Sequence, residues 1–319
     1  MRPRIAAIGT RAAQAPETDY AGALLAGLSS QPKFIPCKFF YDAEGSRLFE
    51  QICTLPEYYP TRVELGLLNK HAAEMAALIG PDAEIVEYGA GAAEKIRPLL
   101  RALHTPQAYV PIDISGPYLQ EIAEGLRSDF PALAIRPLVA DFTREIVLPP
   151  SASRRAGFFP GSTIGNFEPE EARAFLAKAA RTLRGGGLLI GVDLVKDPAI
   201  LHAAYNDPSG VTAAFNKNLL ARANREIGAA FDLTAFSHYA IYNPVPQRIE
   251  MYLISRRAQR VSVCGEMIAF SEGEAIHTES SHKYTIDGFR TLAVSAGFTP
   301  RAVWRDPENL FSIHWLEAA

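Results

Sequence analysis

Short apolar runs alternate with longer stretches of helical periodicity between residues 61 and 196. The runs have the length and composition of buried strands, and the stretches between them place apolar residues at the spacing of one helix face. Because strands that alternate with helices form a parallel sheet with helices on both faces, this region predicts an α/β, Rossmann-like core. The predicted strands are 84–88, 108–113, 134–140, 156–163 and 188–195, and the predicted helices are 92–103, 116–127 and 169–183.

The pattern changes after residue 196. Residues 199–232 predict helices with a polar break at Asn206–Gly210, and residues 233–245 are aromatic without a regular period. The segments that follow alternate with a period of two, which predicts antiparallel strands and not further strand–helix units. These segments are 247–256 and 260–270, followed by a helix that Thr285 caps and by a last strand over 310–316.

The two patterns together predict two lobes. Thr61 and Glu64 have the spacing of a capping box, which would begin the first helix of the core. The Rossmann-like core is expected to comprise residues 61–196 and 285–319. A smaller α+β substrate lobe is expected to comprise residues 1–60, with a helix over 19–28, and the insertion 197–284. A substrate should bind between the lobes, at the C-terminal ends of the core strands.

The composition excludes several classes of function. A net charge of −3 over 319 residues gives no strong field for nucleic acid. No stretch approaches the roughly 18 apolar residues of a membrane span, and the segment Met1–Gly9 is too short in apolar length for a signal peptide. The spacing of Cys37, Cys53 and Cys264 suits neither a disulfide framework nor a metal site, so we expect a reducing, cytoplasmic setting and no metal.

A glycine turn, Gly89-Ala90-Gly91, follows the first core strand. Glycines let a ligand approach the backbone closely, and a helix N-terminus offers free N–H groups to an anion. The turn therefore predicts a nucleotide-type ligand, although such a turn can also simply connect a strand to a helix. The third glycine of the dinucleotide fingerprint is absent, which disfavours a nicotinamide cofactor.

Two further core strands end in acids. Asp113 lies about 20 residues beyond the glycines, where a carboxylate can bind a ribose, although an acid there can also cap the next helix. Asp141 can accept a hydrogen bond from an exocyclic amine, and Phe142 can cover a purine ring. A glycine turn, a ribose acid and an Asp-Phe pair occur in this order in S-adenosylmethionine-dependent methyltransferases.

From residue 36 onward, short motifs follow one another in a fixed order: Phe40–Ser46, Leu55–Arg62, Gly161–Asn166, Val192–Asp197, Tyr205–Asp207, Gly210–Asn216, Ile249–Met251 and Thr278–Ser281. Together they resemble the histidine-specific Nα-methyltransferases of ergothioneine biosynthesis. The resemblance implies a two-lobed monomer that uses S-adenosylmethionine to trimethylate the α-amino group of L-histidine, giving hercynine.

The resemblance also implies which residues bind the cofactor. Gly89 and Lys95 match the cofactor loop, and Lys95 would reach the cofactor's carboxylate unless it is a solvated surface lysine. Asp113 would bind the ribose, and Asp141 and Phe142 the adenine. The family more often has Leu-Gly-Ser-Gly where this chain has Tyr88-Gly-Ala-Gly91, so one hydrogen bond to the cofactor is expected to differ.

The residues that would bind histidine come from both lobes. Asn166 and Tyr205 would position the substrate, Glu279 and Ser281 would bind the imidazole, and Met251 would form an apolar wall. Taken singly, Asn166 suits a helix cap, Glu279 a surface acid and Met251 plain core. The full substrate set is Tyr41, Tyr58, Gly161, Asn166, Tyr205, Met251, Glu279 and Ser281.

No residue is assigned as a general base, because methyl transfer from an activated sulfonium mainly requires that the partners be positioned. Three alternatives stay open from the sequence. They are a methyltransferase for another amine such as tryptophan, a nicotinamide-dependent oxidoreductase, and a non-catalytic cofactor-binding sensor.

Overall fold

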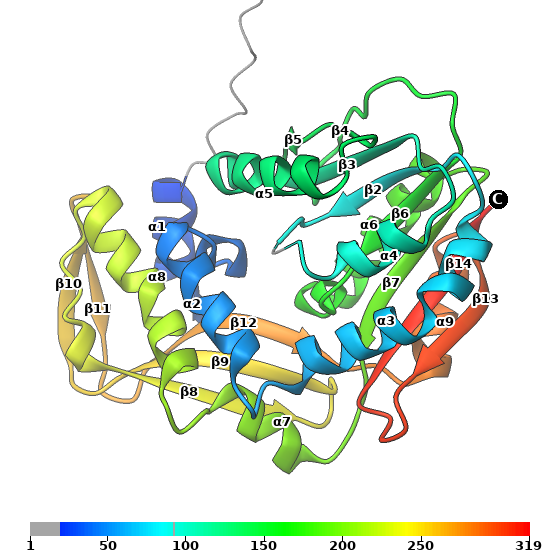
Figure 1. The fold of residues 1–319 in the computed structure, drawn as a ribbon. Helices are drawn as coiled ribbons and strands as arrows, with labels where there is room; N and C mark the ends of the chain where they lie inside the picture. Colours follow the sequence, from blue (N-terminus) through cyan, green and yellow to red (C-terminus); the bar gives the residue numbers. More distant parts are fainter. Residues whose placement is uncertain (1–19, 92) are drawn as a thin grey trace, which may run out of the picture.

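The apolar runs of the core assemble into one eight-stranded sheet (Figure 1). In the computed structural model, which describes residues 20–91 and 93–319, the strand order is β13-β14-β7-β6-β2-β3-β4, and β5 also pairs with β3. Strands β2 to β7 run parallel, whereas β14 is antiparallel to both β7 and β13. Their bounds are β2 Glu84–Tyr88, β3 Ala108–Asp113, β4 Ala134–Ile135, β5 Leu138–Val139, β6 Arg155–Phe159, β7 Gly187–Asp193, β13 Phe298–Arg305 and β14 Phe311–Ala318.

The strand order places β2 between β3 and β6. The connection from β2 to β3 therefore leads to one side of β2, and the later connection to β6 leads to its other side. Such a switch point opens a crevice at the carboxyl ends of the strands. Residues 1–19, which were assigned to the substrate lobe, and Ala92, the first residue of a predicted helix, lie outside the described residues.

Most core strands lie where the sequence predicts them, with three differences. The predicted strand 134–140 is two short strands, β4 and β5. The predicted strand 156–163 ends at Phe159, because Pro160 has no N–H to donate and Gly161 turns the chain with a φ of 78°. Strand β13 was not predicted, since Pro300 and two arginines interrupt its apolar pattern.

Helices cover both faces of this sheet, and each face has its own apolar cluster. Leu68 of α3 and Leu99 of α4 lie in one cluster, whereas Phe175 of α6 and Phe289 of α9 lie in the other. Burying a side chain of this size contributes about 2 kcal/mol, so these contacts hold the strand ends in place. The helices are α3 Tyr59–Ile79, α4 Ile96–Ala102, α5 Gly116–Asp129, α6 Pro169–Thr182 and α9 Ile286–Ser295.

Helix α3 shows that the predicted capping box is wrong. The helix begins at Tyr59 with Pro60 in its first turn, so Thr61 and Glu64 lie inside it and not at its cap. Both side chains are buried, and Glu64 is only 1% exposed. A carboxylate this deeply buried must find partners inside the protein, and its partners lie at the core strand ends.

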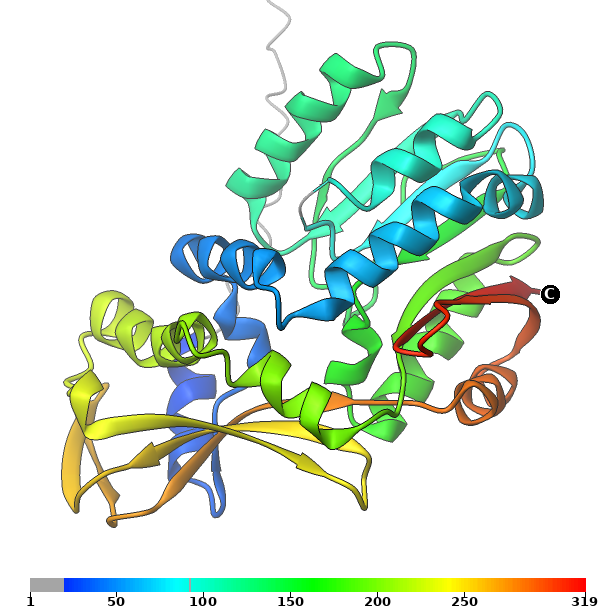
Figure 2. The same ribbon diagram turned by 60° about the horizontal axis from the view of Figure 1, so that its bottom comes forward.

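A second, small sheet has the order β1-β12-β9-β8, and the β10–β11 hairpin forms a separate two-stranded sheet (Figure 2). Helices α1, α2, α7 and α8 share one apolar cluster with it, separate from the two clusters of the core. The strands are β1 Lys33–Phe34, β8 Phe236–Asn243, β9 Arg248–Ser255, β10 Gln259–Val263, β11 Glu266–Phe270 and β12 Ala275–His282. The helices are α1 Tyr20–Ser29, α2 Ala43–Thr54, α7 Pro198–Tyr205 and α8 Val211–Ile227, with short 3-10 turns η1 Cys37–Phe40 and η3 Leu233–Ala235.

Two expectations for this region are wrong. Residues 233–245, expected to be irregular, contain β8, an edge strand whose half-exposed side chains hide the usual alternation. The single strand expected over 260–270 is a hairpin, because Cys264 and Gly265 both take positive φ and reverse the chain.

Strand β12 leads from the small sheet directly to the core. Tyr284, two residues beyond its end, forms a parallel bridge with Leu194 at the end of β7. The Tyr284 N–H donates to the Asp193 carbonyl at 3.0 Å, and the Val195 N–H donates to the Tyr284 carbonyl at 3.0 Å. This bridge places residues 279–283 beside the core strand ends.

No helix in the described part of the chain is long and apolar enough to cross a membrane.

Candidate active site

The glycine turn after β2 lies at the switch point of the core sheet. Gly89 has a φ of 72°, and a Cβ there would lie 3.2 Å from the Phe142 ring, whereas a Cβ at Gly91 would meet nothing within 4 Å. Glycine at position 89 therefore allows both the turn and the close approach of Phe142. Helix α4 begins at Ile96, later than the predicted residue 92.

Asp141 has a free acceptor facing a cavity. Its Oδ1 accepts from the Thr143 N–H at 3.0 Å and from the Thr143 hydroxyl at 2.5 Å. Its Oδ2 is buried and accepts no hydrogen bond from any described residue; Lys38 Nζ lies 3.5 Å and Arg144 Nε 3.6 Å away. Burial opposes the charge, but the Thr143 and Lys38 contacts hold the pKa of Asp141 below its usual value. A buried oxygen that has ion-pair partners but lacks a hydrogen bond fits the exocyclic amine of adenine.

The cavity at Asp141 has a volume of about 250 Å³, and residues of both the core and the small-sheet region line it. Asp113 ends β3 near this cavity; its Oδ1 accepts from the Ser115 N–H at 2.8 Å, and burial raises its pKa to about 6. These two acids thus lie at or just beyond the carboxyl ends of the neighbouring strands β3 and β5. The cavity lining is Lys38, Phe39, Tyr41, Ile114, Ser115, Gly116, Pro117, Asp141 and Arg222.

Phe142 is half-buried in an aromatic cluster of the core. Its ring centroid lies 5.6 Å from that of Phe159 and 6.1 Å from that of Phe175. Packing against these two rings therefore holds the Phe142 ring beside Gly89. Its role as a cover for adenine stays a prediction.

Lys95 is not a solvated surface lysine. Its Nζ lies 2.8 Å from Glu64 Oε2, and its side chain is 18% exposed. Burial opposes the ammonium charge, but the Glu64 carboxylate outweighs burial and raises the pKa of Lys95. Both Glu64 oxygens also accept from the Gly161 N–H at 2.9 Å. Glu64 thus joins Lys95, at the start of α4, to the loop after β6, a role that sequence reasoning missed.

The predicted substrate residues Tyr41, Tyr58 and Tyr205 lie together. The Tyr58 ring centroid is 6.4 Å from that of Tyr205 and 6.2 Å from that of Phe49, and Phe49 lies 5.7 Å from Tyr41. The hydroxyls of Tyr41 and Tyr58 have no hydrogen-bond partner within residues 20–91 and 93–319, while burial raises the pKa of each. The three phenols thus form an aromatic wall with two hydroxyls free for a ligand.

Glu279 is a buried carboxyl in this aromatic surrounding, so the surface-acid alternative is excluded. It is 8% exposed, and burial raises its pKa to about 7 while Lys283 opposes the rise. Met251 lies directly opposite it in the β9–β12 register, so both side chains are on one face of the small sheet. The Glu279 carboxylate accepts no hydrogen bond from the described side chains.

Ser281 belongs to a hydrogen-bond network that crosses from the small sheet to the core. Tyr205 donates to Ser281 Oγ at 2.9 Å, and Lys283 donates to Ser281 Oγ at 2.8 Å and to the Tyr205 hydroxyl at 3.1 Å. Lys283 Nζ also lies 2.9 Å from Asp193 Oδ2. The sequence motifs contained Asp193, but neither Asp193 nor Lys283 was predicted as a site residue.

Asp193 holds a second buried cation. Lys196 Nζ lies 2.6 Å from Asp193 Oδ1 and 2.6 Å from the Tyr59 hydroxyl, which itself donates to Asp193 at 2.8 Å. Burial disfavours the negative charge of Asp193, but Lys283 and Lys196 together hold its pKa below the usual value. Burial lowers the pKa of Lys196 to about 8.

Asn166 does not cap the following helix. Helix α6 is capped at Glu168, whose N–H donates to the Glu171 carboxylate at 3.0 Å. The Asn166 amide has no hydrogen-bond partner among the described residues. A Cβ on the neighbouring Gly165 would lie 2.7 Å from the His282 carbonyl, so the glycine lets this loop pack against β12. This close approach brings Asn166 to the strand that carries Glu279.

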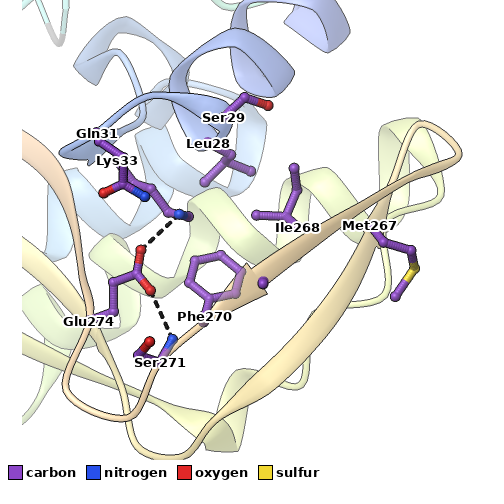
Figure 3. Close-up of a pocket in the computed structure, with 10 residues that line it drawn as sticks. Leu28, Ser29, Gln31, Lys33, Met267, Ile268, Phe270, Ser271 and Glu274 are labelled. Atoms are coloured by element: carbon purple, nitrogen blue, oxygen red, sulfur yellow. Dashed lines mark hydrogen bonds and ion pairs between the residues drawn. The ribbon is translucent and has the colours of Figure 1, made fainter.

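A further cavity of about 480 Å³ lies between α1 and the β10–β11 hairpin (Figure 3). Lys33 pairs with Glu274 at 2.7 Å, and Glu274 also accepts from the Ser271 N–H at 2.8 Å. The two charged groups of this cavity are thus paired with each other, and none of the predicted site residues lines it. Across residues 20–91 and 93–319, no cluster of three or more His, Cys, Asp or Glu side chains could hold a metal ion.

Comparison with known proteins gives consistent matches over nearly the whole chain. A family model described as "Histidine-specific methyltransferase, SAM-dependent" matches residues 20–318. The histidine N-alpha-methyltransferase of Mycolicibacterium smegmatis is 42% identical over 294 residues, which cover 90% of this chain and 91% of that protein. The enzyme of the same name from Mycobacterium tuberculosis is 41% identical over 294 residues, with the same coverage of each chain. Ergothioneine biosynthesis protein 1 of Neurospora crassa is 32% identical over 89% of this chain and 33% of its own length.

Proposed function

The chain belongs to the histidine-specific, S-adenosylmethionine-dependent methyltransferases, and on that premise we propose that it methylates the α-amino nitrogen of L-histidine. The product of complete methylation is the trimethylated betaine hercynine, and the reaction is the first step of ergothioneine biosynthesis. The observation that carries the proposal is the buried, unpaired Glu279 carboxyl beside Ser281 and the tyrosine wall. A carboxylate and a hydroxyl on one strand face suit the two ring nitrogens of imidazole.

We place the cofactor side of the site at the carboxyl ends of the core strands. S-adenosylmethionine supplies a methyl group that its sulfonium charge already activates. We assign Asp113 to the ribose hydroxyls and the free Oδ2 of Asp141 to the adenine amine, with Phe142 and Gly89 beside them. Lys95, already paired with Glu64, supplies a positive charge for the cofactor's carboxylate.

The substrate side lies between the loop after β6 and the small sheet. The Asn166 amide and the Tyr58 hydroxyl, both without partners in the described structure, suit the carboxylate and amine of an amino acid. Tyr205 donates to Ser281 and so supports the imidazole side of the pocket. Gly161, Tyr41 and Met251 line it.

Positioning accounts for the catalysis. The attacking group is the neutral amine, so the α-ammonium of histidine must first lose a proton. No titratable side chain is assigned as its base, and the proton is expected to pass to solvent. Holding the amine in line with the methyl group converts an encounter between two molecules into an intramolecular step, which lowers the barrier by several kcal/mol.

The division of labour between the sheets is part of the proposal. We assign the core, residues 61–196 and 285–319, to the cofactor and the lobe formed by 1–60 and 197–284 to the substrate. The separate apolar clusters of the two sheets support this division. We further propose that the protein acts as a monomer in the cytoplasm on a small molecule, without nucleic acid or membrane partners; light scattering would test the monomer.

A direct test incubates the protein with S-adenosylmethionine and each common amino acid in turn, and follows product mass. Methylation of histidine ahead of every other amino acid supports the proposal. Preference for tryptophan would favour the related amine methyltransferases. Calorimetry with S-adenosylhomocysteine and with NAD checks the cofactor, because a nicotinamide enzyme would bind only the second.

A further inference from the structure

Lys283 is a fully buried cation next to the proposed imidazole site. Its side chain is 1% exposed, as is that of Asp193, its ion-pair partner at 2.9 Å. Burial opposes the ammonium charge, but Asp193 and Tyr205 outweigh burial and raise the pKa of Lys283. The lysine therefore stays charged over the working pH range.

The three N–H groups of Lys283 are all used inside the protein. An ammonium has three donors, and here they meet Asp193 Oδ2, Ser281 Oγ and the Tyr205 hydroxyl. Lys283 therefore has no donor left for a ligand. By hydrogen bonding, it acts on a ligand only through the two hydroxyls that it contacts.

These contacts, together with the greater acidity of a phenol, set which way the hydroxyls point. Ser281 Oγ accepts from Lys283 at 2.8 Å and from Tyr205 at 2.9 Å, which uses both of its acceptor positions. A phenol is a stronger hydrogen-bond donor and a weaker acceptor than an aliphatic hydroxyl, so the Tyr205 proton lies toward Ser281, and the Tyr205 oxygen accepts from Lys283. Within residues 20–91 and 93–319 the Ser281 proton then has no acceptor, so Ser281 serves a ligand as a donor.

We infer that Lys283 is a positioning residue that fixes Ser281 as a hydrogen-bond donor, so that the site binds histidine with a neutral imidazole ring. The inference rests on the proposed function. A neutral imidazole has one N–H, which suits the Glu279 carboxylate, and one bare nitrogen, which accepts from Ser281. An imidazolium would set an N–H against the Ser281 O–H, and an indole has no ring acceptor for it.

The titratable groups that face this network come from both sheets. Glu279 on β12 is the acid nearest the ring site, and burial raises its pKa to about 7, so its protonation changes the binding of two neutral rings alike and that of an imidazolium more strongly. The test therefore compares two ligands at each pH. The remaining groups around the network are Cys37, Tyr41, Tyr58, Tyr59, Asp193, Lys196 and Tyr205.

The experiment measures the dissociation constants of L-histidine and of triazolylalanine by calorimetry, with S-adenosylhomocysteine present, between about pH 5 and pH 8. The triazole ring stays neutral over this range, whereas imidazole gains a proton near pH 6.5. When the bound ring is neutral in both ligands, the effects of pH on Glu279 and on the common α-amino group cancel in the ratio of the two constants. For the unaltered chain, this ratio should rise about tenfold for each pH unit below about 6.5.

The variant Lys283→Met should remove that slope, because Ser281 can then turn and accept from an imidazolium. The matched control is Lys196→Met. Lys196 shares Asp193 and is similarly buried, but it contacts neither Ser281 nor Tyr205. The control should keep the slope of the unaltered chain.

Three results would overturn the inference: a flat ratio in the unaltered chain, an undiminished slope in Lys283→Met, or a slope lost equally in Lys196→Met. If Lys283→Met does not fold, the unaltered chain still decides through its own slope. Histidine methylation by the same preparation is measured in parallel. Methylation with a flat ratio overturns this inference alone, whereas no methylation of histidine overturns the proposed function and this inference with it.

Discussion

Replacing Glu279 by glutamine should make the unliganded protein more stable while weakening its action on histidine. Glu279 is buried without a hydrogen-bond donor in the described structure, and its pKa is about 7, compared with 4.5 for an unperturbed glutamate. A carboxyl whose pKa rises on folding holds its proton more tightly in the folded chain, so the native state loses stability as the pH rises through this window. The difference corresponds to about 3 kcal/mol at pH 8, since one pH unit is worth about 1.4 kcal/mol.

Glutamine does not titrate, so Glu279→Gln should gain most of this energy at about pH 8 and almost none near pH 4.5. Urea unfolding at about pH 5 and pH 8 measures the gain. Glu272→Gln, on the exposed turn that precedes β12, is the control and should change stability little at either pH. A Glu279→Gln protein that is less stable than the unaltered chain at pH 8 would refute the reasoning.

The same variant should lower kcat/KM for histidine by about tenfold. Glutamine keeps an acceptor oxygen but loses the charge that strengthens the hydrogen bond from the ring N–H. The variant is thus expected to lose activity while it gains stability, as is typical of a group that is retained for binding. Unchanged kcat/KM for histidine would remove the case that Glu279 binds the imidazole.

Three further variants test other parts of the site. Asn166→Ala should lower kcat/KM for histidine by about tenfold or more, with an unchanged urea midpoint, because its amide has no partner within the described residues; equal kcat/KM would contradict its assignment. Asp141→Ala should weaken S-adenosylhomocysteine binding by about tenfold in calorimetry, since its free Oδ2 is the proposed adenine acceptor; unchanged binding would exclude that role. Glu64→Gln should lower the free energy of unfolding by about 2 kcal/mol, because Lys95 loses a buried carboxylate while the Gly161 N–H keeps an acceptor. An unaltered urea midpoint for Glu64→Gln would show that the ion pair contributes nothing.

The core could be predicted from the sequence because its strands are buried on both faces. Runs such as Glu84–Tyr88 and Ala108–Asp113 are apolar along most of their length and are followed by helices of clear periodicity. Strands β8 and β13 lack that signal. Their positions depend on pairing with β9 and β14, which no local pattern reveals.

The residues proposed to face the ligands could be assigned in part from the sequence, since the glycine turn and the acids at the strand ends recur with their chemistry. The residues that support them could not. Glu64 follows Thr61 at the spacing of a capping box, and only the fold shows that its carboxylate reaches Gly161 and Lys95. Asp193 and Lys283 lie 90 positions apart and meet because β12 leads onto the end of β7.

The central claim is that the methyl group of S-adenosylmethionine is transferred to the α-nitrogen of histidine. The most direct measurement supplies the donor with an isotopically labelled methyl group, together with L-histidine, and locates the label in the product by NMR. The account predicts labelled methyl groups on the α-nitrogen, three of them at completion, with both ring nitrogens unmodified. Label on a ring nitrogen, or an unlabelled histidine pool, would contradict it.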